Sequence, residues 1–174
     1  RSAAGIAYVV MGSFSVVDVD LSLVATGSAA GFRILGAAPN DNMGKSVNGA
    51  GDVNGDGFAD VIVGALFASS PSASQTGAAY VVFGRSNPFV DVDLKIMRPS
   101  LSTGFYIFGA MTNDICGFAV GSAGDVNNDG VDDVLVGPAA YVIYGKNFID
   151  EPSSQPSSRP SAQPSRQPSG QPSR

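Results

Sequence analysis

Short runs of β-branched and aromatic residues alternate with clusters of Gly, Asn, Asp and Ser along most of the chain. Residues 60–64, 79–84 and 133–137 are examples, each five or six residues long and bounded by turn-forming residues. This pattern is typical of β-strands. No window of helical length shows apolar residues at a 3.6-residue period without an interrupting Gly. The chain is therefore predicted to be all-β and built from many short strands.

An internal repeat organises these predicted strands. Residues 31–65 and 104–138 align without a gap at an offset of 73, and 20 of 35 positions are identical. The same offset places 17–21 on 90–94, and Tyr8-Val9-Val10 recurs at Tyr80 and, with one substitution, at Tyr141. Short strands recurring at a long period favour the blades of a propeller or a related repeat array.

The composition changes sharply at about Glu151. Residues 151–174 are six tetrads with Pro and Ser at the second and third positions, and Ala162 is their only aliphatic residue. Such a segment buries too little apolar surface to offset the entropy of ordering, and its regular prolines favour extended polyproline II. We therefore divide the chain into a β-repeat domain, 1–150, and a Pro/Ser-rich tail, 151–174.

The tail repeats every four residues, whereas polyproline II has three residues per turn, so successive prolines rotate by about 120° around the rod. This geometry disfavours a one-faced P-x-x-P ligand. Ser/Pro-rich segments of this kind are typically O-glycosylated stalks, and a bare linker is the alternative. The expected carbohydrate attachment sites are the Pro and Ser of the tetrads: Pro152, Ser153, Pro156, Ser157, Pro160, Ser161, Pro164, Ser165, Pro168, Ser169, Pro172 and Ser173.

Charge and residue types exclude several functions. Fifteen acidic against ten basic residues give a net charge of −5, which disfavours a nucleic-acid partner because phosphate binding needs a basic surface. With no His, the chain has no Ser-His-Asp triad, Cys–His pair or His-ligated zinc site. One Cys precludes an internal disulfide. No apolar run reaches the roughly 18–20 residues that span a bilayer, so membrane insertion is not expected.

Two nine-residue loops occupy the same phase of the repeat, 52–60 and 125–133. Oxygen-bearing side chains stand at positions 1, 3, 5 and 9, and a Gly at position 6 allows the sharp turn that lets the carbonyl of residue 7 face inward. Such an all-oxygen, carboxylate-rich cage favours Ca2+ over Mg2+ or Zn2+. We predict two Ca2+ ions, one held by Asp52, Asn54, Asp56, the Phe58 carbonyl and Asp60, and one by Asp125, Asn127, Asp129, the Val131 carbonyl and Asp133.

A solvated Asp/Asn/Gly turn is the alternative interpretation of either loop. Against it, the loops recur at one phase of the repeat and together hold seven of the fourteen acidic residues of 1–150. An EF-hand or dockerin loop would need a ligand at its twelfth position and flanking helices. Val63 and Val136 stand at that position, inside apolar β-type runs. The sequence therefore favours calcium loops set between strands.

These features together resemble the FG-GAP repeats of the integrin α-subunit β-propeller and related secreted repeat proteins. The resemblance lies in the Gly-Phe-x-Ile-x-Gly segments at 31–36 and 104–109, the Gly-x-x-Val segments at 44–47 and 117–120, the calcium loops and the strands that follow them. It covers most of 5–146. Cys116 occupies the position of Met43 in the other copy, and we expect it to be a small core residue.

The resemblance implies four-stranded blades with calcium loops in strand-to-strand turns. By the strand order of the family, the chain begins with the third and fourth strands of one blade, 5–12 and 31–36. It continues with a complete blade, 43–109, and ends with three strands of another, 116–145. The predicted fold is thus about two FG-GAP β-propeller blades and a partial one, not a closed propeller alone, followed by the polyproline II tail.

Adhesion and extracellular scaffolding are the roles that the resemblance implies. We expect a secreted, calcium-binding structural or adhesion protein of the cell surface, and not an enzyme. Asp18/Asp20 and Asp91/Asp93 alternate with apolar residues, so we interpret them as the solvent face of a strand and not as catalytic pairs. The unfinished blades leave strand edges that are expected to pair with copies of the same chain, head to tail in a filament. The alternative is a fragment of a longer secreted FG-GAP protein that binds a ligand or carries an enzyme domain elsewhere.

Overall fold

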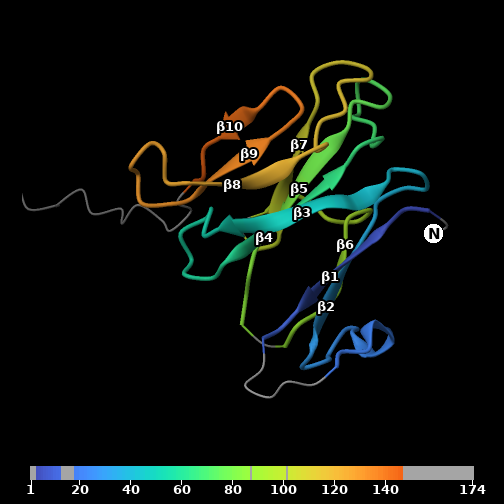
Figure 1. Ribbon diagram of the computed structural model, residues 1–174, viewed down its shortest axis with the longest axis vertical. Coiled ribbons are helices and arrows are strands. Elements are labelled where there is room, and N and C mark those ends of the chain that lie inside the picture. The colour runs from blue at the N-terminus through green and yellow to red at the C-terminus, as the bar shows by residue number, and fades with distance from the viewer. Residues whose placement is uncertain (1–2, 13–17, 87, 101, 147–174) are drawn as a thin grey trace, which may run out of the picture.

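The computed structural model describes residues 3–12, 18–86, 88–100 and 102–146 (Figure 1). The domain boundary near 151, the tail conformation and the proposed carbohydrate sites lie outside these residues. Within the described ranges the chain forms ten strands and one 3-10 helix, with no α-helix. The strands of these described ranges make separate sheets and close no barrel among themselves. The predicted all-β fold of partial propeller blades is confirmed.

The ten strands form three sheets, which we call sheets 1, 2 and 3 in chain order. Sheet 1 contains β1 (Ile6–Val10), β2 (Gly31–Leu35) and β6 (Val92–Asp93). Sheet 2 contains, in spatial order, β3 (Met43–Gly51), β4 (Asp60–Ala65), β5 (Ala78–Val82) and β7 (Gly104–Phe108). Sheet 3 contains β8 (Val120–Gly124), β9 (Asp133–Val136) and β10 (Tyr141–Ile143). The 3-10 helix η1 (Leu21–Leu23) lies between β1 and β2.

The sheets have the strand content that the repeat predicts. Sheet 2 is a complete antiparallel meander, in which Val63 lies opposite Tyr80 and Tyr80 opposite Tyr106. Sheet 1 contains the pair that corresponds to β5 and β7, with Tyr8 opposite Arg33. Sheet 3 contains the three strands that correspond to β3, β4 and β5. A short turn at 137–140 joins β9 to β10, where sheet 2 has the longer connection 66–77.

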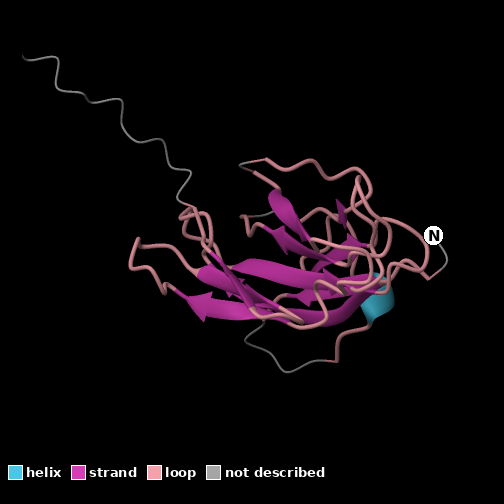
Figure 2. Cartoon of the chain, turned by 90° about the horizontal axis from the view of Figure 1, so that it is seen from above, coloured by secondary structure: helices cyan, strands magenta, loops and turns pink. Residues whose placement is uncertain are grey.

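Two hydrophobic clusters fill the spaces between neighbouring sheets. Alternate residues of a strand point to opposite faces, so β4 contributes Val63 to the cluster shared with sheet 1 and Ile62 to the cluster shared with sheet 3. In the same way β5 contributes Tyr80 to the first cluster and Val81 to the second. The strands of neighbouring sheets accordingly lie one over another, with the loops at their ends (Figure 2).

Strand β6 is a feature that the sequence interpretation did not predict. It belongs to the long connection between β5 and β7, and it pairs in parallel with β2 of sheet 1, with Ile34 opposite Val92. Leu94, which follows directly, is buried in the cluster between sheets 1 and 2. The connection of one blade therefore reaches back and covers the outer strand of the preceding blade.

The solvent-face interpretation of the two aspartate pairs is wrong for Asp91 and incomplete for Asp20. The side chain of Asp91 is only 12% exposed and forms an ion pair with Arg33 of β2. Its Oδ1 also accepts a hydrogen bond from the backbone N–H of Arg33 at 2.9 Å. Asp20 caps η1, since its Oδ1 accepts the N–H of Ser22 at 2.9 Å. Both carboxylates have structural roles.

The single cysteine is a core residue, as expected. Cys116 is buried in the cluster between sheets 2 and 3, and Met43 is buried in the cluster between sheets 1 and 2. Burial raises the pKa of the Cys116 thiol to about 11, with a further contribution from the charge of Asp114. The thiolate is therefore scarce at neutral pH.

Among the described residues, no helix has the length and apolar character needed to cross a membrane.

Candidate metal centre

The two candidate calcium loops lie at equivalent places in sheets 2 and 3. Loop 52–60 joins β3 to β4, and loop 125–133 joins β8 to β9. A register irregularity precedes each loop, between Gly49 and Gly51 in β3 and between Ser122 and Gly124 in β8. Such bulges re-aim the chain as it leaves a ladder. Each loop therefore starts from the bent end of the first strand, in chain order, of its sheet.

The aspartate at position 1 organises each loop around its carboxylate. Asp52 accepts the backbone N–H groups of Gly55 at 2.8 Å and Gly57 at 2.8 Å, through Oδ1 and Oδ2 respectively. Asp125 accepts the N–H of Gly130 at 2.9 Å in the same way. The position-6 glycines Gly57 and Gly130 have φ of +87° and +93°, which favours glycine. The predicted sharp turn is present in both loops.

Positions 3 and 5 come together in each loop. The Asn54 amide donates to Asp56 Oδ2 at 2.8 Å, and the Asn127 amide donates to Asp129 Oδ2 at 2.8 Å. The remaining oxygen of each aspartate accepts the N–H of residue 7, Phe58 at 2.9 Å and Val131 at 3.1 Å. The two loops thus repeat the same hydrogen-bond pattern. That recurrence argues against two unrelated solvated turns.

The aspartate at position 9 is buried and joins its loop to the end of the third strand. Asp60 accepts the N–H of Val53 at 2.9 Å and that of Gly84 at 2.8 Å. Asp133 accepts the equivalent backbone N–H groups of the second loop, including that of Gly145 at 2.8 Å. Burial raises the pKa of Asp60 to about 6, against the lowering effect of these two N–H donors, and the charges of Asp56 and Asp52 raise it further.

The donor set fits a hard divalent cation by type. Each loop offers oxygens from two or three carboxylates, one Asn and the main chain, the ligands that Ca2+ prefers. The side chains at positions 1, 3 and 5 lie together, whereas both oxygens at position 9 accept backbone N–H groups. Within the described ranges, no cluster of three or more Asp, Glu, His or Cys side chains has the arrangement to hold a metal by itself. A cation in these loops would therefore depend on amide and carbonyl oxygens as well.

The sequence interpretation missed the residue that joins the two loops. Asp132 Oδ2 accepts the backbone N–H of Asp52 at 2.8 Å, and the N–H of Asp132 donates to the Asp52 carbonyl at 2.9 Å. The N–H of Lys146 also donates to the Val53 carbonyl at 2.8 Å. A difference between the two copies could have indicated this residue. The second loop has Asp132 where the first loop has Ala59.

Comparison with known proteins agrees with this arrangement. The sequence profile of the FG-GAP repeat family matches residues 43–82, which contain β3, the first loop, β4 and β5. This part of the chain carries an FG-GAP repeat. The three-stranded sheet 3 repeats the same order of strand, loop and strand at the C-terminal end of the described residues.

Integrin α subunits are among the similar proteins. The chain is 35% identical over 95 residues to integrin alpha pat-2 of Caenorhabditis briggsae, covering 55% of this chain. It is 34% identical over 114 residues to integrin alpha-PS5 of Drosophila melanogaster, covering 61% of this chain. It is also 30% identical over 86 residues, or 49% of this chain, to phosphatidylinositol-glycan-specific phospholipase D of Mus musculus. The matched segments span only 7%, 10% and 10% of these relatives.

Proposed function

We propose that this chain is a calcium-binding structural or adhesion protein of the cell surface or extracellular space, that it is not an enzyme, and that copies of it assemble head to tail. The observation that carries the calcium assignment is the shared set of hydrogen bonds among positions 1, 3, 5, 6 and 7 of two acidic loops in neighbouring blades. The likeness to integrin α subunits supports the extracellular adhesion role. The buried Cys116 offers no activated nucleophile, which agrees with a non-enzymatic role.

Calcium is proposed to stabilise the fold because the ligand oxygens come together only when the flanking strands are paired. A cation that binds the folded chain and not the unfolded chain raises the free energy of unfolding through mass action. It would also relieve the repulsion among the seven acidic residues that the two loops hold. Asp56 and Asp129, at position 5, are the ligands whose removal disturbs the buried core least, since both are solvent-exposed in part.

Isothermal titration of the full chain with Ca2+ tests the assignment. Wild type is expected to bind two ions, and Asp56→Ala and Asp129→Ala one each. Asp18→Ala, which removes an exposed carboxylate outside the loops, is the matched control and retains both ions. Thermal unfolding with and without chelator gives a second measurement. A wild type whose titration shows no binding and whose melting temperature ignores chelator refutes the calcium proposal.

Open strand edges support self-assembly. β5 of the complete blade pairs on both sides, with β4 and with β7. Its counterparts β1 and β10 each have a neighbour on one side only among the described residues. Unpaired edges are templates for pairing with another chain. The two edges differ, so the association that they favour is heterologous and builds either a ring or a filament.

The alternative function is that of a segment of a larger secreted protein, in which other blades lie in the same polypeptide. Its support is the small share of each relative that the chain spans, including a relative that is named as a phospholipase D. The intact mass of the native protein separates the two proposals. A polypeptide several times longer than 174 residues favours the alternative, and one of about this length favours self-assembly and reports attached carbohydrate as added mass.

A further inference from the structure

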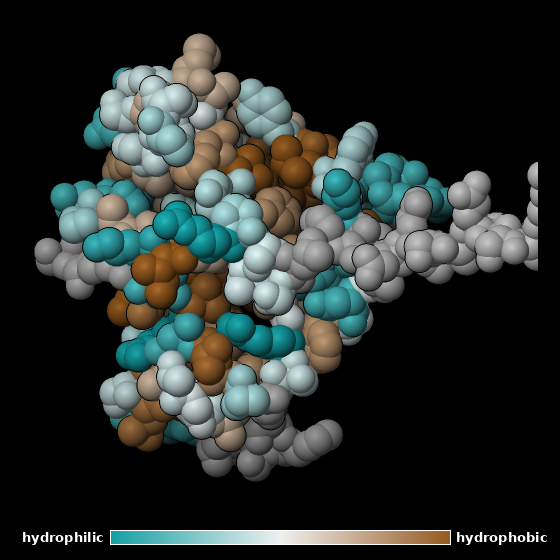
Figure 3. Space-filling view, turned by 180° about the vertical axis from the view of Figure 1, so that it is seen from behind, coloured by the Kyte–Doolittle hydropathy of each residue, from teal (hydrophilic) through white to brown (hydrophobic). Residues whose placement is uncertain are grey.

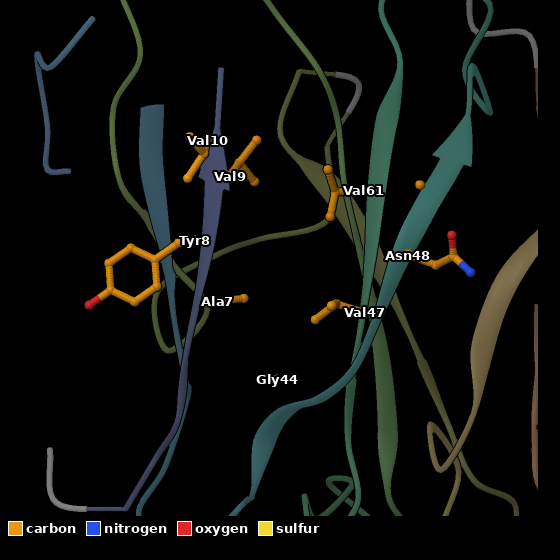
Figure 4. Close-up of a pocket in the computed structure, with 9 residues that line it drawn as sticks. Ala7, Tyr8, Val9, Val10, Gly44, Val47, Asn48 and Val61 are labelled. Carbon is orange, nitrogen blue, oxygen red and sulfur yellow. The ribbon is translucent and has the colours of Figure 1, made fainter. Parts of the chain in front are cut away.

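The outward face of sheet 1 carries apolar side chains that nothing among the described residues covers. Ile6, Tyr8 and Val10 alternate along β1, and Val19 and Leu21 lie in the following connection; all five are between 37% and 49% exposed. In the close-up of the groove beside β1, Tyr8 points away from β3 and β4, whereas Ala7 and Val9 lie on the side toward Val47 and Val61 (Figure 4). We define the head surface as Ile6, Tyr8, Val10, Val19 and Leu21.

The internal repeat shows what covers the same positions elsewhere in the chain. The counterparts of Ile6, Tyr8 and Val10 in β5 are Ala78, Tyr80 and Val82, and the offset of 73 relates Leu21 to Leu94. These four counterparts are at most 5% exposed, and all belong to the cluster between sheets 1 and 2. Val92, the counterpart of Val19, packs against the same cluster. The preceding sheet therefore buries four of the five counterparts of the head surface, and the fifth, Val92, is partly buried.

The opposite end of the molecule has the complementary face. Leu135 of β9 and Val142 of β10 are 39% and 43% exposed and point away from sheet 2. Their counterparts in sheet 2, Ile62 and Val81, are fully buried against sheet 3. A groove of about 500 Å³ lies beside Leu135, lined also by Val120 and Pro138. We call Leu135, Val142 and this groove the tail surface, a name that does not refer to the Pro/Ser-rich tail, 151–174.

Both halves of one interface are thus present on a single chain, at opposite ends. We infer that the head surface of one copy packs face to face on the tail surface of a second copy, reproducing the contact between consecutive sheets. This inference rests on the proposed self-assembly. In it, the faces of the sheets are in contact between copies, in addition to the strand edges. Apolar patches are visible at the height of β1 and β2 in the space-filling view (Figure 3).

The repeat also indicates which faces meet in the contact. Val9 of sheet 1 packs against the cluster that contains Val82 of sheet 2. Val142 is the counterpart of Val9 and Val10 is the counterpart of Val82. The face of sheet 3 that carries Val142 is therefore expected to meet, in the next copy, the face of sheet 1 that carries Tyr8 and Val10. Because the two surfaces differ, a dimer joined in this way retains one free head surface and one free tail surface, and association continues beyond a dimer.

Sedimentation velocity of the full chain in millimolar Ca2+, over about a hundredfold range of concentration, tests the interface. Tyr8→Lys blocks the head and Val142→Lys blocks the tail, and both positions are exposed, so the folded monomer is retained. Ile96→Lys, at an exposed position outside both surfaces, is the matched control. Wild type and the control are expected to form species larger than dimers, and each blocked variant alone to stay monomeric.

An equimolar mixture of the two blocked variants gives the decisive result. Tyr8→Lys keeps an intact tail surface, and Val142→Lys keeps an intact head surface. These two surfaces bind each other, so the mixture is expected to form dimers and nothing larger. A wild type that stays monomeric overturns the self-assembly proposal itself. A wild type that assembles while both variants assemble equally well overturns only the face-to-face interface and leaves edge pairing. If either lysine variant has a lowered melting temperature, Tyr8→Ala and Val142→Ala replace them, and unchanged association of these variants overturns the interface too.

Discussion

Two leucines at equivalent repeat positions should respond very differently to truncation. Leu94 follows β6, is 5% exposed, and packs with Phe32 and Ile34 of sheet 1. Its N–H also donates to the Leu35 carbonyl at 3.0 Å. Leu21, 73 positions earlier, is 45% exposed because no preceding sheet is present among the described residues. Leu94→Ala and Leu21→Ala thus make the same chemical change in the presence and in the absence of a covering sheet.

The expected magnitudes follow from burial. Truncating a buried Leu to Ala costs about 2–5 kcal/mol, through lost transfer free energy and the cavity that remains. Leu94 lies under a surface connection that can settle toward the cavity, so we expect the lower part of this range, about 2–3 kcal/mol. An exposed apolar side chain contributes little, and Leu21→Ala should change the free energy of unfolding by less than about 0.5 kcal/mol. For a chain of this length, the Leu94 effect corresponds to a fall in melting temperature of about 5–10 °C.

Chemical and thermal unfolding, followed by circular dichroism at low protein concentration and saturating Ca2+, measures both variants. Low concentration keeps the chain monomeric, so that Leu21 is free of any contact with a second copy. Equal losses of stability in the two variants would refute the assignment of β6 as the cover of β2. At concentrations where wild type assembles, Leu21→Ala should in addition weaken association, whereas Leu94→Ala should not act through the head surface.

Three further predictions concern charge, backbone and tail. Burial acts to raise the pKa of the Asp91 carboxyl, but hydrogen bonds from Arg33 outweigh it and hold the pKa below the ordinary value of 3.8. The ionised Asp91 carboxylate therefore stabilises the folded state above about pH 4, and this stabilisation is lost as pH falls through the lowered pKa. The free energy of unfolding of Asp91→Asn, measured from pH 7 to pH 3, should depend less on pH than that of wild type. Gly51→Ala should lower the free energy of unfolding by at least about 1 kcal/mol more than Gly124→Ala. Both glycines have positive φ, but only at Gly51 would a Cβ overlap a carboxylate of the neighbouring loop. Urea unfolding measures the difference, and equal losses would contradict the described loop contact. Residues 151–174 should carry carbohydrate on Pro or Ser, so a peptide from native material whose mass equals the bare sequence would refute that proposal.

The strands and their grouping into blades were predictable because their signals are local and repeated. Strand β4 and strand β9 share the pattern Asp-Val-x-Val-Gly, and each follows an acidic loop in which Gly57 or Gly130 marks the turn. A repeat with 20 of 35 identical positions fixes the correspondence of the copies without knowledge of contacts. The burial of Cys116 followed in the same way, since Met43 occupies its position in the other copy.

Contacts between segments far apart in the chain were not predictable in this way. The alternation of Asp91, Val92 and Asp93 indicates a strand with one polar face, and a polar face is ordinarily solvated. Its actual environment depends on Arg33, which lies 58 positions away on another sheet. A parallel pair of only two residues leaves no sequence signature of its own, so β6 appears only when the sheets are packed.

The candidate metal centre shows the same division between local and distant information. The candidate ligands of each loop lie within nine consecutive residues, and the sharp turn at Gly57 and Gly130 was predictable from them, but the connection between the loops was not. Asp132 reaches Asp52 across 80 positions and binds its backbone from both sides, through a carboxylate and an N–H group. The first loop is therefore shaped partly by the second blade to which it does not belong. Ordering the second loop, by a cation or by blade packing, should accordingly help to order the first, because Asp132 can fix the start of loop 52–60 only when its own loop has folded.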